Sequence, residues 1–203
     1  SAASVWSGIV QVQDQRATIE RVQREQVRDL TAVEEANAGP EGEAGYNAYY
    51  AFMLTQDPPP PLAFAAIGQR DLQPYVLRVR ALGLQSQLYD SETYNPELAL
   101  PGVFDWAFVL IYLLPLVVIA LGHDLVTAER EGGRLRLLLS LPGNGLWRRR
   151  VGLRYTAVLL AVGLPLIIGA MIMAAPAVSI ATMILIAALY SAFWFGLAML
   201  IGG

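Results

Sequence analysis

Residues 106–122, WAFVLIYLLPLVVIALG, carry no charged side chain, and the flanking acids are Asp105 and Asp124. A helix of roughly 17 residues rises about 1.5 Å per residue, so it only narrowly crosses a hydrocarbon layer of about 30 Å. We interpret this stretch as a membrane span whose length is close to the minimum.

The sequence after this span is first basic and then apolar. Residues 123–154, HDLVTAEREGGRLRLLLSLPGNGLWRRRVGLR, contain seven Arg and three acidic residues, whereas residues 155–203 carry no charge. The runs 155–175 and 178–201 are each long enough to cross a bilayer, and the short break at Pro176 predicts an antiparallel pair. Because short basic loops stay in the cytoplasm, loop 123–154 is predicted to be cytoplasmic.

Charge divides the chain into two halves. Residues 1–105 carry 14 acidic residues and seven Arg, while residues 106–203 carry three acidic residues and seven Arg. This asymmetry favours an extracytoplasmic insertion domain at 1–104 and a transmembrane region at 105–203, in a multi-pass protein of the cytoplasmic (inner) membrane. It argues against binding to nucleic acid.

The basic residues restrict the chemistry. All 14 are Arg, and the chain has no Lys, no Cys and a single His, His123. A phosphate-binding loop and a Schiff-base enzyme need Lys, and a thiolate nucleophile or zinc-thiolate site needs Cys. We therefore predict no catalytic, cofactor or metal site, and no ATP hydrolysis by this chain alone.

The extracytoplasmic part is predicted to be mostly helical. Residues 11–35, QVQDQRATIERVQREQVRDLTAVEE, place apolar side chains at helical spacing. We expect Glu20 to pair with Arg24, and Glu25 to pair with Arg28, on the outer face. The apolar positions are Val12, Ile19, Val22, Val27, Leu30 and Val33.

The rest of this part carries breakers and aromatic residues. Prolines 58–61 predict an extended arm. We interpret residues 62–90 as one or two short helices, broken near Gly68 and Pro74. These helices would carry Arg70, Arg78 and Arg80. The aromatic residues expected at the membrane interface are Tyr94, Phe104 and Trp106.

The two ends of the sequence carry a further expectation. There is no initiator Met, and an outside-facing N-terminal half must have been exported. We expect an earlier span or signal before Ser1, with residues 5–10, VWSGIV, as its last turn. The fold class predicted from all these patterns is all-α, namely a fragment of a polytopic membrane protein with three transmembrane helices.

The cytoplasmic loop contains an amphipathic segment and a basic triplet. Residues 127–142, TAEREGGRLRLLLSLP, have charges in the first part and leucines in the second. Such a segment predicts a short helix on the inner membrane surface, with one face free to dock a partner. After Trp147, the side chains of Arg148, Arg149 and Arg150 are expected to anchor the next span at the headgroups.

The same segment resembles a known family. Residues 129–132, EREG, followed by Leu135 and by residues 137–142, LLLSLP, are similar to the signature of ABC-2 type transporter permeases. The lead-in at 94–105 resembles the subgroup with a long extracytoplasmic insertion between spans one and two, the multicopper-enzyme-maturation-type permeases. Gly133 stands where that family usually has Thr.

This resemblance implies a six-span permease, of which this chain would hold the insertion and spans two to four. It implies a dimer in the bilayer and a separate ABC ATPase subunit that binds ATP and Mg. The loop would be the coupling helix that sits in a groove of the ATPase. The docking residues implied by analogy are Glu129, Arg130, Glu131, Arg134 and Arg136.

Two other functions remain open from the sequence. The chain could be a membrane-anchored assembly or maturation factor that binds an exported protein through residues 1–104. It could also be a sensor anchored by a helical bundle. Neither alternative needs the ATPase, and the substrate of a permease is not indicated.

Overall fold

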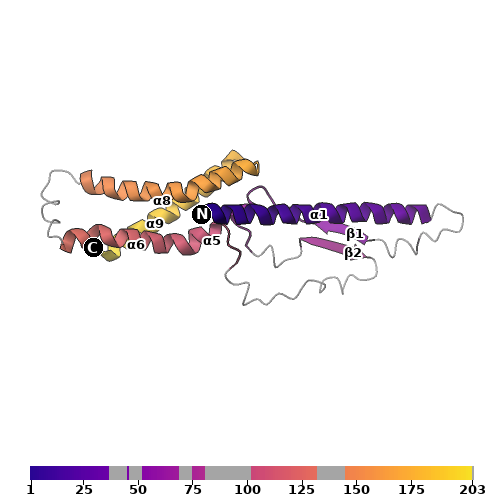
Figure 1. Cartoon of the computed structure of the whole chain (residues 1–203), viewed down its shortest axis with the longest axis horizontal. Helices are drawn as coiled ribbons and strands as arrows, with labels where there is room; N and C mark the ends of the chain where they lie inside the picture. Colours follow the sequence, from indigo (N-terminus) through magenta and orange to yellow (C-terminus); the bar gives the residue numbers. More distant parts are fainter. Residues whose placement is uncertain (37–44, 46–51, 69–74, 81–101, 132–144, 203) are drawn as a thin grey trace. The chain divides into compact units, whose positions relative to one another are not determined.

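The computed structural model describes residues 1–36, 45, 52–68, 75–80, 102–131 and 145–202, with the backbone alone at 52, 80, 123–131, 145–148 and 202 (Figure 1). The described residues form two compact units. Unit 1 comprises Ser1–Ile9, Phe64–Ala66 and Phe104–Gly203, and unit 2 comprises Val10–Ala63 and Ile67–Val103. The division at Phe104 lies beside the expected boundary at residue 105, and unit 1 also takes in two pieces of the N-terminal half.

The chain is mostly helical, as predicted, but it is not all-α. The elements in order are α1 Ala2–Ala36, β1 Phe52–Gln56, the 3₁₀ helix η1 Ala63–Ala65, β2 Val76–Arg80, α5 Trp106–Phe108, the π-helix η2 Val109–Leu113, α6 Leu114–Glu131, α8 Gly145–Ile172 and α9 Ala177–Gly202. Since α5, η2 and α6 follow one another without a gap, the chain is helical throughout Trp106–Glu131.

Unit 1 is a helical bundle whose helix directions are fixed by side-chain contacts. Trp106 contacts Val162, and Arg154 contacts Leu121, so α6 and α8 are antiparallel. Gly122 lies against Ala198, and the Tyr190 hydroxyl contacts the Ile111 carbonyl, so α6 and α9 run in the same direction. Figure 1 shows these three helices in the part of the chain coloured from rose to yellow.

A tight helix end joins α8 to α9. The Ala175 N–H donates to the Ala170 carbonyl at 2.9 Å, and the Ala174 N–H donates to the Met171 carbonyl at 3.2 Å. Ala174 has a φ of 53°, and Pro176 follows directly before α9. These bonds and the left-handed residue are those of a Schellman motif. The predicted antiparallel pair at Pro176 is confirmed, because Tyr155, in the first half of α8, donates through its hydroxyl to the Ala188 carbonyl and contacts the ring of Phe195 in the second half of α9.

Two glycines bring the N-terminal half against α8 within unit 1. Phe64 is fully buried. A Cβ on Gly8 would lie 2.0 Å from the Phe64 carbonyl oxygen, and a Cβ on Gly169 would lie 2.7 Å from the Phe64 ring and from Val5. The missing side chain of Gly169 makes room for an aromatic side chain.

Unit 2 pairs most of α1 with a two-stranded sheet. The predicted helix over 11–35 is confirmed, and it begins earlier, at Ala2. Strands β1 and β2 are antiparallel, with Leu54 opposite Arg78. The Asp57 N–H extends the ladder by donating to the Tyr75 carbonyl at 2.9 Å.

The prediction of helices over 62–90 is wrong in its described parts beyond the 3₁₀ turn Ala63–Ala65. Residues 76–80, VLRVR, form strand β2 instead, so Arg78 and Arg80 lie on a strand. The alternation of Leu77 and Val79 with the two arginines matches the two-residue period of a strand. Arg70 and Tyr94 lie outside the described residues.

Candidate functional site

The predicted docking residues fall at the end of α6 and beyond it. Glu129, Arg130 and Glu131 belong to the last turn of α6, where the backbone alone is described. Arg134 and Arg136 lie outside the described residues. The structure therefore places the start of the predicted docking segment on a helix that continues directly from the apolar stretch 106–122.

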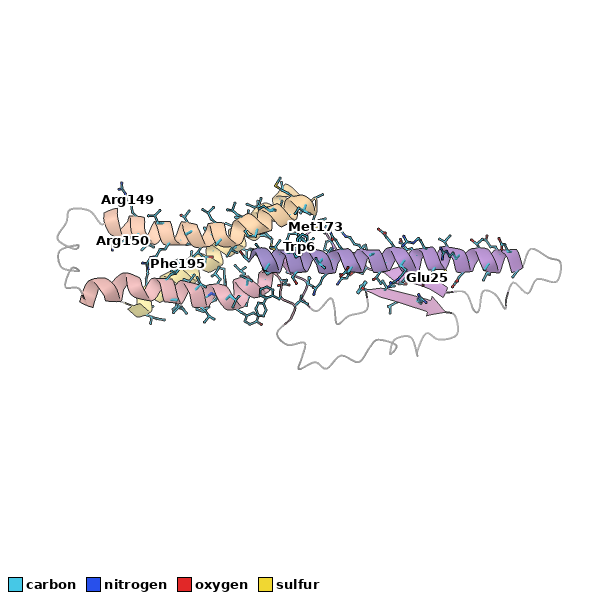
Figure 2. All side chains as sticks on the ribbon, viewed as in Figure 1. Trp6, Glu25, Arg149, Arg150, Met173 and Phe195 are labelled. Atoms are coloured by element: carbon cyan, nitrogen blue, oxygen red, sulfur yellow. The ribbon has the colours of Figure 1, made fainter. Side chains whose placement is uncertain are left out.

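The predicted anchor residues lie near the start of α8. Arg148 belongs to this helix, and the side chains of Arg149 and Arg150 are exposed (Figure 2). Cations are disfavoured near a helix N-terminus, because the helix dipole places partial positive charge there. The position of these arginines is thus not explained by the helix itself, and it suits contact with an anionic surface.

Both groups lie at the same end of unit 1. Helices α6 and α8 are antiparallel, and the Arg154 guanidinium near the start of α8 donates to the carbonyl of Leu121 in α6. Glu129–Glu131 therefore lie at the end of α6, and Arg148–Arg150 lie at the neighbouring start of α8. The backbone thus brings together the two parts of the predicted cytoplasmic site.

Several other polar contacts of unit 1 join helices through side-chain donors and main-chain carbonyls. The Trp106 indole N–H donates to the Val162 carbonyl at 3.0 Å, and the Tyr155 hydroxyl donates to the Ala188 carbonyl at 2.8 Å. Neutral bonds of this kind are typical of helices packed in lipid, where few other partners exist. These bonds connect the apolar helices of unit 1 to one another.

At the start of α5, the structure gives Asp105 and Trp106 positions or roles that the sequence analysis did not predict. Trp106 was expected at the membrane interface, but only 2% of it is exposed. Asp105, treated only as a boundary, caps the helix, because its carboxylate accepts the Phe108 N–H at 2.8 Å. An Asp directly before an apolar helical run is a known N-cap signal, so the sequence carried this information. Phe104 is 44% exposed, and its place at a membrane interface stays a prediction.

The described residues contain no group of three or more His, Cys, Asp or Glu side chains that could hold a metal ion. His123 belongs to α6. Among the described helices, two are long and apolar enough to cross a membrane, namely Arg149–Ile172 and Ala177–Ile201. The apolar helix Trp106–Gly122 is shorter than these two.

Comparisons of this chain with family models, with curated proteins and with solved structures found no match. The function is therefore argued from the residues and their arrangement.

Proposed function

We propose that this chain is part of the membrane-spanning permease subunit of an ABC transporter. In this proposal, loop 123–154 docks a separate ATPase subunit in the cytoplasm, and ATP hydrolysis by that subunit drives export of a substrate. Residues 106–122, 155–175 and 178–201 are its spans, and residues 1–104 are extracytoplasmic. The chain itself is not an enzyme, and it works as a permease dimer.

The observation that carries the membrane assignment is the low burial of the two longest apolar helices. Only 28% of the apolar window in Arg149–Ile172 and 22% of that in Ala177–Ile201 is buried. A core helix of a water-soluble protein would be mostly covered, because exposed apolar patches of this extent are costly in water. Exposed residues such as Met171, Val178 and Leu200 instead suit contact with lipid chains.

The transport assignment depends on the loop between α6 and α8. Its sequence resembles the ABC-2 signature, and the antiparallel directions of the two helices are those that a loop between consecutive spans requires. Arg149 and Arg150 near the start of α8 supply the positive charge expected of a cytoplasmic end. In this proposal, a movement of the ATPase is transmitted through the loop to both α6 and α8.

The test uses the full chain in its membrane. We expect it to remain in the membrane fraction after alkaline washing and to co-purify with an ATPase whose turnover it changes. Arg134→Glu combined with Arg136→Glu should reduce that association by about tenfold or more, because reversing two interface charges adds about 1.4 kcal/mol or more of repulsion.

The matched control reverses two exposed arginines of α1, Arg21→Glu with Arg28→Glu, and should leave ATPase association unchanged. If the loop reversal leaves both association and transport intact, the docking assignment is wrong. The assembly-factor function is the alternative, and the exposed charged surface of α1 within unit 2 favours it. Co-purification of an exported protein without any ATPase would support that alternative.

A further inference from the structure

Two prolines interrupt the helices of unit 1. Pro115 lies at the start of α6, directly after the π-helix, and Pro165 lies inside α8. Proline has no backbone N–H, so it leaves the carbonyl four residues earlier without its usual helical donor. The carbonyls concerned are those of Ile111 and Ala161.

The Ile111 carbonyl receives a donor from another helix. The Tyr190 hydroxyl of α9 donates to it at 3.3 Å. The preceding residue cannot take over the role of Pro115, because the Leu114 N–H already donates to the Val109 carbonyl in the π-helical turn. Since half of Ile111 is exposed, an unpaired carbonyl here would face lipid in the proposed membrane location.

The Ala161 carbonyl is served in the same way. The Ser1 hydroxyl of the N-terminal segment donates to it. The neighbouring carbonyl, that of Val162, accepts the Trp106 indole N–H. At both prolines, therefore, the carbonyl that lost its helical donor accepts a hydroxyl from a different part of unit 1.

We propose that Tyr190 and Ser1 are proline caps, meaning hydroxyl groups that replace the missing N–H of a proline in a neighbouring helix. Each cap ties one interrupted helix to its neighbour at the interruption. The bond from Tyr155 to the Ala188 carbonyl differs, because residue 192 is Ala and keeps its own N–H. In this proposal the Leu116 N–H keeps its α-helical acceptor, the Tyr112 carbonyl. Loss of the Tyr190 hydroxyl then leaves the Ile111 carbonyl unpaired, whereas loss of the Tyr155 hydroxyl leaves no carbonyl unpaired.

This proposal rests on the membrane location given under Proposed function, but not on transport or on an ATPase. It predicts an energetic coupling between residues 115 and 190. Tyr190→Phe should raise the unfolding equilibrium constant of the bicelle-embedded full chain by about threefold, the usual effect of losing such a bond in membranes. In a Pro115→Ala background the N–H is restored, and Tyr190→Phe should then have no effect.

Tyr155→Phe is the matched control, because it removes a hydroxyl from a carbonyl that no proline has freed. Its effect should be the same in the wild-type chain and in the Pro115→Ala background. An equal effect of Tyr190→Phe in both backgrounds would overturn the proposal. A second cycle, Ser1→Ala with Pro165→Ala, tests the other cap if the Tyr190 variant does not fold. Equal effects there would overturn it as well.

A direct measurement separates the cap from general packing. An infrared label on the Ile111 carbonyl should shift to higher frequency in Tyr190→Phe, because the carbonyl loses a hydrogen bond. The carbonyl frequency should return to its wild-type value when Tyr190→Phe is combined with Pro115→Ala. A carbonyl frequency that neither substitution changes would contradict the proposal. Neither readout requires the ATPase, so a failed cap and a failed docking assignment are distinguishable.

Discussion

The two units differ in the polar contacts that several of their side chains make. In unit 1, donors such as Trp106 and Tyr155 reach main-chain carbonyls of neighbouring helices, and Trp106 is buried. In unit 2, exposed side chains pair with one another. The Gln23 amide donates to the Gln56 amide oxygen at 2.9 Å, and Arg78 forms an ion pair with Glu25.

In the membrane location proposed above, the difference follows from the solvent that each surface meets. Exposed charge pairs compete with water, and they contribute only about 0.2 to 1 kcal/mol. Neutral bonds to carbonyls have few competitors in a lipid layer, so they suit a surface that lacks water. The contacts of each unit therefore indicate different surroundings, and substitutions that act on one unit should leave the other unchanged.

The largest effect is expected where unit 1 is packed most tightly. Gly8→Ala would place a Cβ 2.0 Å from a main-chain oxygen, that of Phe64, which cannot rotate away. We expect a loss of about 3 kcal/mol in the free energy of unfolding, as for other overpacked sites. Detergent-induced unfolding in bicelles measures this loss.

Gly163→Ala is the control for this substitution. Gly163 also lies in a unit 1 helix, but a Cβ there would meet nothing within 4 Å. Alanine should then raise stability by up to about 1 kcal/mol through its higher helix propensity. If alanine changes the free energy of unfolding equally at both glycines, then the contact between Gly8 and Phe64 is not tight. Unit 1 would then lack the tight packing that the comparison assumes.

A smaller effect is expected at the buried indole. Trp106→Phe removes the N–H that donates to the Val162 carbonyl and also reduces the buried volume. We expect a loss of about 1 to 2 kcal/mol in the free energy of unfolding, unchanged by salt, because neither group is charged. Trp6→Phe is the matched control, because Trp6 is 66% exposed and its substitution should cost little. A strong salt dependence of the Trp106 variant would contradict the assignment.

The sequence predicts the helices of both units better than their contacts. The helical spacing over 11–35 and the apolar runs after residue 154 are long, so many residues agree on one period. Their directions also follow, since the break at Pro176 is too short for anything but a reversal. The docking residues 134 and 136 were predicted from the loop sequence, and they stay a prediction because they lie outside the described residues.

The sequence analysis missed a short strand and several long-range contacts, for physical reasons. Strand β2 is five residues long, and its paired residues in β1 lie 20 to 28 positions earlier. The local pattern of Leu77 to Arg80 therefore had little weight against a helical interpretation. Burial of Trp106 depends on Val162 in another helix. A sequence shows which carbonyl Pro115 leaves without its donor, but the donor itself is known only from the fold.

The smallest effect is expected at the ion pair of unit 2. Glu25 was predicted to pair with Arg28 in its own helix, but it pairs with Arg78 of β2, while the predicted Glu20 and Arg24 pair is present at 3.8 Å. Glu25→Gln should lower the local stability of β1 and β2 by about 0.5 kcal/mol at low salt, which hydrogen exchange of their amides measures.

This small effect gives the sharpest contrast between the units. At about 1 M salt the screening length falls to about 3 Å, so wild type and Glu25→Gln should exchange at the same rate. Glu20→Gln is the control, because its partner Arg24 lies on the same helix and does not hold the sheet. A Glu25→Gln effect that persists at high salt would mean that the pair is shielded from water, and the two units would then no longer differ in their solvent.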